Sequence, residues 1–239
     1  MLKPIAADVW RLAMAAPIKL PGGLRMPLAA TVVRLVDGSL LLYSPIALDD
    51  ASVAALREHG EVGHIVAPSL LHHMYAKAAA ERFPKAVLHV ARGLAARNSA
   101  LAGGRELGET EAGAGWGDGI EAQRIDGAPK LAEVVLFHRP SGTLMCADLV
   151  FNVTAHANLM TRVILGMTGT GGKQVAQSRI WQFAVRDRAA TRASLDRVLA
   201  WPIQRVAPCH GEVAAIDRAG LAQKLSRAYG GAAPVASAS

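Results

Sequence analysis

The chain has 239 residues, 51% of them apolar and 19% charged, so it can bury a core without disulfide support and is not a disordered protein. Its two cysteines exclude a disulfide scaffold. The formal net charge of +7 is compatible with an anionic partner, but the arginines are scattered with few aromatic residues between them, so a nucleic-acid surface is not favoured.

No membrane segment is predicted. The longest weakly charged stretches, such as residues 163–172, are interrupted by glycine and are shorter than the roughly 20 residues that a membrane-spanning helix needs. Near the N-terminus, Asp8 and Arg11 interrupt the apolar run that a secretory signal would require. We therefore expect a cytoplasmic protein.

The first predicted elements are a hairpin, a helix and a strand. Residues 31–46 contain two β-rich runs on either side of an Asp-Gly pair, which is typical of tight hairpin turns. Asp49 or Asp50 can cap a helix that ends near Gly60. A short strand is expected over 64–68.

The chain then alternates between helices and strands. An alanine-rich helix is expected over 74–83, and a strand over 85–91. Residues 92–119 are rich in glycine and predict a long surface loop with a short helix. Two strands within 132–150 enclose a Pro-Ser-Gly turn, and the second of them runs to Asp148.

The last third of the chain has a helical period over 157–167 and a second helix over 187–200, which leads into a strand over 203–208. Strands and helices in this order indicate an α/β (α+β) protein with a single domain over 1–230. The final residues, 231–239, have the composition of a disordered tail.

Three of the predicted strands are each followed by residues that can bind a metal. His72 and His73 follow the strand over 64–68, Asp148 follows the later hairpin, and His210 follows the last strand. A single histidine in such a place is more often structural. Because strand ends at one edge of a layered sheet converge on one face, three such ends together predict a shared site. Imidazole and carboxylate groups suit zinc, iron or manganese.

These motifs resemble those of the metallo-β-lactamase superfamily, and in particular its divergent DUF4336 branch. The resemblance covers nearly the whole chain and implies a four-layered αββα sandwich with a metal site at one edge, between the two sheets. The first metal motif of the family, H-x-H-x-D-H, falls on residues 68–73. Pro68 and Leu70 replace its first two histidines, His72 stands at its aspartate, and His73 matches its last histidine.

Two further family motifs have counterparts here. The Gly-Asp pair, whose aspartate bridges two metals in the family, corresponds to Ala147-Asp148, and the terminal Gly-His-Gly corresponds to residues 209–211. The remaining family histidine precedes the strand that leads to the bridging aspartate, and residues 127–137 contain no histidine at that place. The resemblance therefore implies that one of the two metal positions is lost.

The other position would hold one divalent metal ion, with zinc as the first choice and iron or manganese as alternatives. The resemblance implies His73, Asp148 and His210 as its ligands, with His72 as a fourth candidate. His72 and Asp148 are also the candidates for catalytic roles. In the family the aspartate at the position of His72 both ligates and takes up a proton, and a neutral imidazole could do either.

Three more polar residues could line a pocket at this site. Glu133 begins the strand that lacks the family histidine, and we interpret it first as an exposed strand-start charge, with membership of the site as the alternative. Asn152 and His156 follow Asp148 closely, but no spacing gives them a role beyond the pocket wall.

Hydrolysis is the function that these residues favour. An ion with an open coordination position lowers the pKa of its water, so that metal-bound hydroxide attacks an ester, thioester, amide or phosphoester. The alternative is a non-catalytic binding or regulatory protein that retains the fold with a degenerate site. Iron-dependent redox chemistry ranks last, because relatives with that chemistry depend on the histidines that are absent here.

We expect a small-molecule substrate, anionic in view of the net charge, and leave the oligomeric state open.

Overall fold

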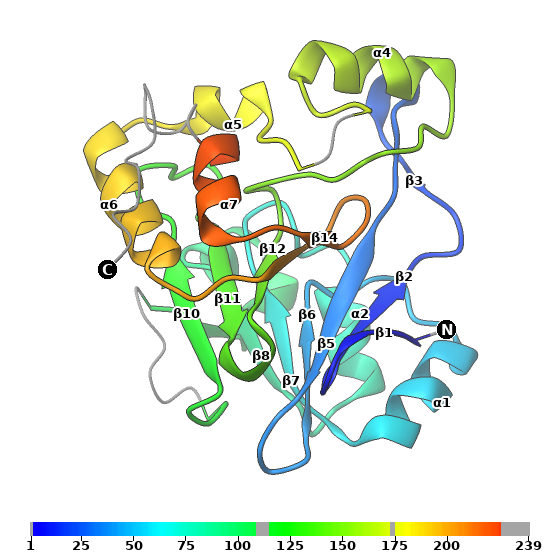
Figure 1. Cartoon of the computed structure of the whole chain (residues 1–239). Helices are drawn as coiled ribbons and strands as arrows, with labels where there is room; N and C mark the ends of the chain where they lie inside the picture. The colour runs from blue at the N-terminus through cyan, green and yellow to red at the C-terminus, as the bar shows by residue number, and fades with distance from the viewer. Residues whose placement is uncertain (1, 109–114, 173–174, 226–239) are drawn as a thin grey trace.

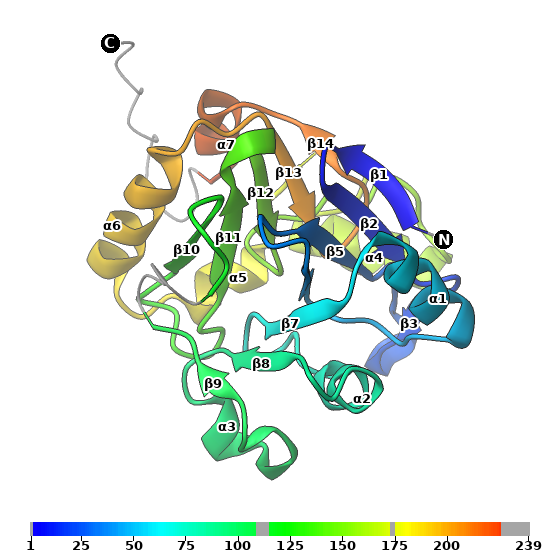
Figure 2. The same ribbon diagram turned by 90° about the horizontal axis from the view of Figure 1, so that it is seen from below.

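The computed structural model describes residues 2–108, 115–172 and 175–225 and contains two β-sheets that face each other, with helices on both outer sides (Figures 1 and 2). The predicted tail over 231–239 lies outside these residues. This is the expected four-layered αββα sandwich. Within the described part of the chain, no helix is both long enough and apolar enough to cross a membrane.

The larger sheet has seven strands in the order β1-β2-β5-β6-β7-β8-β9. Neighbouring strands are antiparallel from β1 to β6 and parallel from β6 to β9. The strands are β1 (Leu2–Ala6), β2 (Val9–Ala13), β5 (Ala29–Arg34), β6 (Leu40–Tyr43), β7 (Val62–Ala67), β8 (Val87–Val90) and β9 (Arg105–Glu106). The predicted hairpin of 31–46 is confirmed as β5 and β6, and the Asp37 carboxylate in its turn accepts hydrogen bonds from the backbone N–H and the hydroxyl of Ser39.

The second sheet has five strands in the order β10-β11-β12-β13-β14. Only β12 and β13 run parallel to each other. The strands are β10 (Ile120–Arg124), β11 (Val134–His138), β12 (Thr143–Cys146), β13 (Arg205–Pro208) and β14 (Ala214–Ala215). The turn between β11 and β12 ends at Gly142, whose φ of 60° is a left-handed conformation that glycine adopts without strain.

Helices cover both outer faces. The larger sheet carries α1 (Asp50–His59) and α2 (Ala76–Arg82), with α3 (Leu94–Arg97) beyond β8 (Figure 2). The second sheet carries α5 (Arg179–Ala184), α6 (Arg188–Leu199) and α7 (Arg218–Leu225). The expected cap of α1 is confirmed, because the Asp49 carboxylate accepts the Ser52 N–H at 2.8 Å.

One helix and one small hairpin stand apart from these layers. The helix α4 (Leu159–Thr168) lies beside the two-stranded hairpin of β3 (Ile18–Lys19) and β4 (Arg25–Met26), above the sheets in Figure 1. The backbone N–H of Arg25 donates to the hydroxyl of Thr161 at 2.9 Å, and the Asn158 amide donates to the Gly23 carbonyl at 3.1 Å. These bonds hold α4 against the hairpin.

The core lies in two layers. Apolar side chains of both sheets pack between them, and the buried Tyr43 hydroxyl crosses this layer to donate to the Val134 carbonyl at 2.9 Å. A second cluster fills the space between the five-stranded sheet and its helices, where the rings of Phe137 and Trp201 stack with centroids 5.3 Å apart. The free cysteines Cys146 and Cys209 are both buried. They act as small apolar groups in this packing.

Residues 92–119 differ from the expected surface loop. In addition to α3 they contain a 3-10 turn over Ser99–Leu101 and the short strand β9. Leu101, Leu107 and Trp116 are buried, so the segment packs against the larger sheet, while 109–114 lie outside the described residues. The sequence also left β1, β2, β10 and α7 unassigned.

Candidate metal centre

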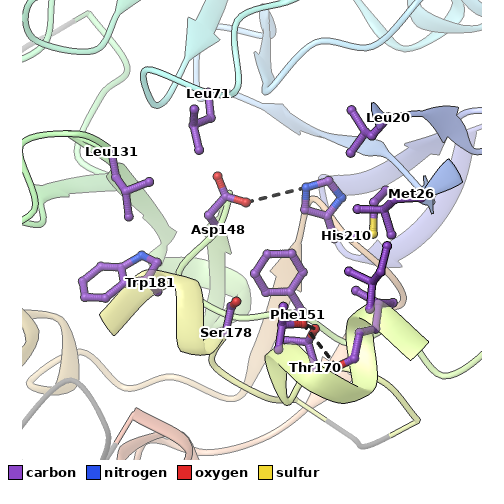
Figure 3. A pocket seen from close by; sticks show the side chains of 14 residues that line it. Leu20, Met26, Leu71, Leu131, Asp148, Phe151, Thr170, Ser178, Trp181 and His210 are labelled. Atoms are coloured by element: carbon purple, nitrogen blue, oxygen red, sulfur yellow. Dashed lines mark hydrogen bonds and ion pairs between the residues drawn. The ribbon is translucent and has the colours of Figure 1, made fainter. Parts of the chain in front are cut away.

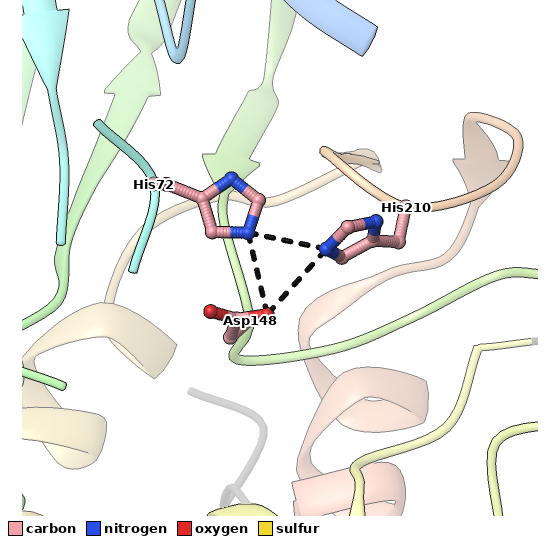
Figure 4. A group of neighbouring side chains, drawn as sticks. All are labelled: His72, Asp148 and His210. Carbon is pink, nitrogen blue, oxygen red and sulfur yellow. Dashed lines mark hydrogen bonds and ion pairs between the residues drawn. The ribbon is translucent and has the colours of Figure 1, made fainter. Parts of the chain in front are cut away.

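Three side chains from three strand ends meet at one edge of the sandwich (Figure 4). His72 follows β7, Asp148 follows β12, and His210 follows β13. The Nε2 atoms of the two histidines are 3.1 Å apart, and they lie 3.4 Å and 3.6 Å from Oδ1 of Asp148. Within the described residues, this is the one group of three or more potential ligands whose donor atoms all lie within 4.8 Å of each other.

The ring and the backbone of His72 are each held by a hydrogen bond. Its Nδ1 is hydrogen-bonded to the Ser44 hydroxyl at 3.1 Å, and its backbone N–H donates to the hydroxyl of Ser69 at 3.0 Å. Burial lowers the pKa of His72, but the adjacent Asp148 carboxylate outweighs it and raises that pKa well above the usual value. Without a cation, His72 therefore carries the proton that compensates Asp148.

The His210 ring has one tautomer imposed on it. Its Nδ1 donates to the Pro27 carbonyl at 2.9 Å, which leaves the lone pair of Nε2 directed at the cluster. The ring stacks on Phe151 with centroids 5.1 Å apart and an interplanar angle of 3°. Burial, followed by the nearby His72, lowers the pKa of His210 to about 4, so this imidazole is neutral.

The turn that carries His210 is held from behind by Arg11 on β2. The guanidinium of this buried arginine donates to the Pro208 carbonyl at 2.9 Å and to the Gly211 carbonyl. From the other side, the Asn152 N–H donates to the His210 carbonyl at 3.0 Å. The backbone on both sides of His210 is therefore anchored.

Glu133 positions the turn that carries Asp148, and the expectation of an exposed charge was wrong. The residue is 0% exposed, and its carboxylate accepts the backbone N–H groups of Ala147, Asp148 and Leu149 at 2.8, 3.2 and 3.2 Å. Burial, followed by repulsion from Asp148, raises the pKa of Glu133 to about 7. The segment needs this carboxylate because three backbone N–H groups converge on one buried point.

The structure does not bring the other predicted site residues into the cluster. His73 lines the neighbouring cavity, but its Nδ1 faces the amide of Asn98 at 3.5 Å. Asn152 is buried and donates to the Glu212 carbonyl at 2.9 Å, so it connects loops rather than lining the site. His156 lies against Gly171 and Gly172.

Sequence reasoning missed Arg11, Ser44 and Ser69. Arg11 and Ser69 contact backbone groups, and Ser44 contacts Nδ1 of His72, on the side of the ring away from the cluster. No sequence motif indicates such contacts.

The donor set fits a divalent ion. Two Nε2 atoms and one carboxylate converge, and the other nitrogen of each ring is occupied by a hydrogen bond that orients it, as is usual for metal-binding histidines. Oδ2 of Asp148 is buried and has no hydrogen-bond partner among the described residues, which a bound cation or water would satisfy. At the two replaced family positions, the Pro68 carbonyl accepts the Val134 N–H and the Leu70 N–H donates to the Leu131 carbonyl, each at 2.8 Å. The Leu70 side chain packs against a small apolar cluster, and neither residue offers a side-chain ligand.

Two cavities open at the cluster. One, of about 200 Å³, lies under α4 and α5 and includes Asp148 and His210 in its wall (Figure 3). The other, of about 330 Å³, lies beside the loop of His72 and contains the same two residues. A molecule bound across both cavities would present its middle to the three converging side chains.

Comparison with known proteins agrees with this architecture. The chain is similar to the metallo-β-lactamase DIM-1 exposed to ceftazidime (15% identity, TM-score 0.63, 97% of this chain and 95% of that chain). It is also similar to a metallo-β-lactamase from Pontibacter korlensis (17%, 0.61, 95% and 98%) and to FIM-1 from Pseudomonas aeruginosa in the mono-zinc form (13%, 0.59, 90% and 89%). At these identities the likeness shows the fold alone.

No curated protein matches the sequence significantly. A family model described as "Domain of unknown function (DUF4336)" matches residues 8–168, which is more than half of the chain. The chain therefore belongs to the DUF4336 family and has the fold of the metallo-β-lactamases.

Proposed function

We propose that this protein is a hydrolase that uses one divalent ion, with zinc as the first choice and iron or manganese as alternatives. The convergence of His72, Asp148 and His210 at the junction of two cavities is the observation that carries the proposal. Such an ion lowers the pKa of a water molecule and polarises a carbonyl or phosphoryl oxygen.

The residues of this chain have separate roles in the proposal. Nε2 of His72, Nε2 of His210 and the Asp148 carboxylate hold the ion, while Ser44 and the Pro27 carbonyl keep the two rings in orientation. Nε2 of His72 lies 3.4 Å from Oδ1 of Asp148. Both residues are candidates for taking up a proton from the attacking water: Asp148 through the carboxylate oxygen that does not hold the ion, and His72 only where its Nε2 is not bound to the ion.

A non-catalytic binding protein is the weaker alternative. Its support is the loss of the first metal position. The remaining donors are nevertheless oriented by hydrogen bonds, and Oδ2 of Asp148 is left unpaired, which a purely structural cluster does not require. This arrangement favours a working metal centre.

The experiment is a measurement of metal content and of hydrolysis in the same preparations. We expect one ion per chain in the wild type by inductively coupled plasma mass spectrometry, and its loss in His72→Ala and in His210→Ala. His73→Ala is the matched control, because the neighbouring ring faces Asn98, and it should retain the ion.

Hydrolysis of ester, thioester, amide and phosphoester probes should follow the metal content of these variants. The proposal is overturned if the wild type binds none of the three metals, or if it binds one and hydrolyses no probe.

A further inference from the structure

The cavity of about 200 Å³ beside the cluster is walled almost entirely by apolar side chains (Figure 3). Most of them come from the β3–β4 hairpin, from α4 and α5, and from the segment after β12, and Leu71 and Leu131 complete the wall. Prominent among them are Leu24, Met26, Phe151, Ile164, Leu165 and Trp181. This wall does not match an ionic ligand.

The polar groups of this cavity are few and uncharged apart from the cluster itself. The Thr168 hydroxyl bonds the Thr170 hydroxyl at 3.0 Å and the Leu165 carbonyl at 3.2 Å. No lysine or arginine is among the described residues that line either cavity. A phosphate or carboxylate placed in this cavity, away from the ion that the cluster would hold, would lose its hydration without gaining a counter-charge, which is costly. The lining therefore favours an uncharged ligand over the anionic one that the net charge suggested.

The cavity is large enough for a chain of several carbon atoms. An apolar cavity of about 150 Å³ holds benzene, so one of about 200 Å³ has room for an unbranched chain of roughly six to eight carbons. The second cavity shares Leu20, Leu71, Asp148 and His210 with the first and extends to the other side of the cluster. The cluster thus lies between an apolar compartment and a larger, more polar one.

The apolar character continues on the outside of the same region. Leu71, which lines both cavities, is 59% exposed, and Met74 at the second cavity is 62% exposed. The helix α4 also turns apolar side chains to solvent, namely Leu159, Met160, Val163 and Met167. Such a rim is typical of the entrance to a site for an apolar ligand.

We propose that the substrate is a neutral carboxylic ester with an unbranched alkyl chain of roughly six to eight carbons, and that this chain occupies the cavity under α4 and α5. The proposal rests on the hydrolase function above. Water supplies the hydroxyl group to the acyl carbon, the bond from that carbon to the ester oxygen breaks, and the second proton of the water goes to the departing alcohol. The products are one carboxylic acid and one alcohol, and no oxidant or reductant is needed.

Binding is tested first, without any turnover, by isothermal titration calorimetry of the protein as purified with methyl ketones from 2-hexanone to 2-decanone. The Kd should fall about fourfold for each added methylene. Ile164→Trp fills the cavity from α4 and should abolish this trend. Val163→Trp places the same side chain on the preceding residue, which is 47% exposed and outside the cavity wall, and should preserve the trend. Ketones that fail to bind the wild type, or that bind equally well at all lengths, overturn the proposal.

Turnover is then measured with p-nitrophenyl acetate, p-nitrophenyl octanoate and p-nitrophenyl phosphate. We expect kcat/KM to be higher for the octanoate by two orders of magnitude or more, and Ile164→Trp to remove this preference. Metal-dependent hydrolysis without a preference for length contradicts the substrate assignment and leaves the hydrolase function standing. Length-dependent ketone binding without hydrolysis of any ester supports the apolar chain site and contradicts the ester substrate. The hydrolase function itself fails only if the thioester, amide and phosphoester probes are not hydrolysed either.

Discussion

Glu133 contributes to the site without being one of the converging donors. Oε1 of its buried carboxylate accepts the backbone N–H groups of Ala147 and Leu149, and Oε2 accepts that of Asp148. In Glu133→Gln one oxygen can still accept the N–H groups of Ala147 and Leu149, but an NH₂ group faces the N–H of Asp148. Leaving that buried donor unpaired should cost about 1–3 kcal/mol of unfolding free energy, and weaken metal binding by about 10–100-fold.

Urea unfolding and competition with a zinc chelator measure these two effects. Glu81→Gln, on the exposed side of α2 where the residue pairs only weakly with Lys77 at 3.7 Å, is the control. If Glu133→Gln resembles this control in both measurements, Glu133 does not position Asp148.

Gly211, directly after His210, has no room for a side chain. Its φ is +92°, and an added Cβ would lie 2.0 Å from the Asn152 carbonyl oxygen. Gly38 in the β5–β6 turn has a similar φ of +84° with nothing within 4 Å. Gly38→Ala should therefore cost only the left-handed backbone penalty of about 1–2 kcal/mol. Gly211→Ala should cost at least twice as much and release the ion, because His210 must move. Equal losses of stability in thermal unfolding would show that the turn can relax.

Among the elements, α4 is the one that both walls the apolar cavity and exposes apolar side chains. Its first turn is capped by Asn158, whose side-chain oxygen accepts the Thr161 N–H at 2.7 Å. Asn158→Ala removes this cap and also the amide bond to the Gly23 carbonyl, so it should destabilise the helix by at least about 1 kcal/mol. This corresponds to at least roughly fivefold faster amide exchange across Leu159–Thr168. Exchange in β7 and β12 should not change. Uniform acceleration throughout the chain would instead mean that α4 unfolds only together with the whole protein.

The elements that could be predicted from the sequence are those that are determined by residues close together in the chain. The Asp-Gly turn of 31–46 and the Asp49 cap act within a few residues, and both are confirmed. The strands β1 and β2 were not predicted, because LKPIA and VWRLA are short and β1 contains a proline. The strand β2 pairs with β5, which lies about twenty residues further along the chain, and β1 pairs only with β2.

The same distinction applies to the site. The three strand ends could be recognised because each carries its ligand immediately after an apolar run. The sequence could not show which of the two adjacent histidines faces the cluster, because the loop after β7 has no periodicity. The contacts with Ser69 and Ser44 direct His72 toward the cluster. The burial of Glu133 was equally hidden, because the N–H groups that it accepts belong to residues 14 to 16 positions later.

At the scale of the whole molecule, the cluster connects the two sheets. His72 follows a strand of the seven-stranded sheet, whereas Asp148 and His210 follow strands of the five-stranded one. The unfolded chain cannot reproduce this arrangement, so an ion bound there would stabilise the fold as a whole, by about 2.7 kcal/mol at a concentration 100 times its Kd. The metal would therefore be as important for the packing of the two halves as for chemistry.

Acid stability also depends, at the same scale, on a second histidine pair, at the opposite end of β7 from the cluster. Nδ1 of His64 lies 3.0 Å from Nε2 of His89, and the Trp116 ring packs edge-on against both. His89 is 0% exposed, and burial, followed by repulsion from His64 and Arg105, lowers its pKa to about 4 from 6.5.

Between these pKa values the unfolded chain binds a proton at His89 that the folded chain does not, so the folded state loses stability as the pH falls from about 6.5 towards 4. From pH 7 to pH 5 this single group should lower the unfolding free energy by about 2 kcal/mol. His89→Gln retains a hydrogen-bonding side chain toward His64 but has no such proton to bind. The fall in urea-unfolding free energy between the two pH values should therefore be about 2 kcal/mol smaller in the variant than in the wild type, and an equal fall in both would place the acid sensitivity elsewhere in the molecule.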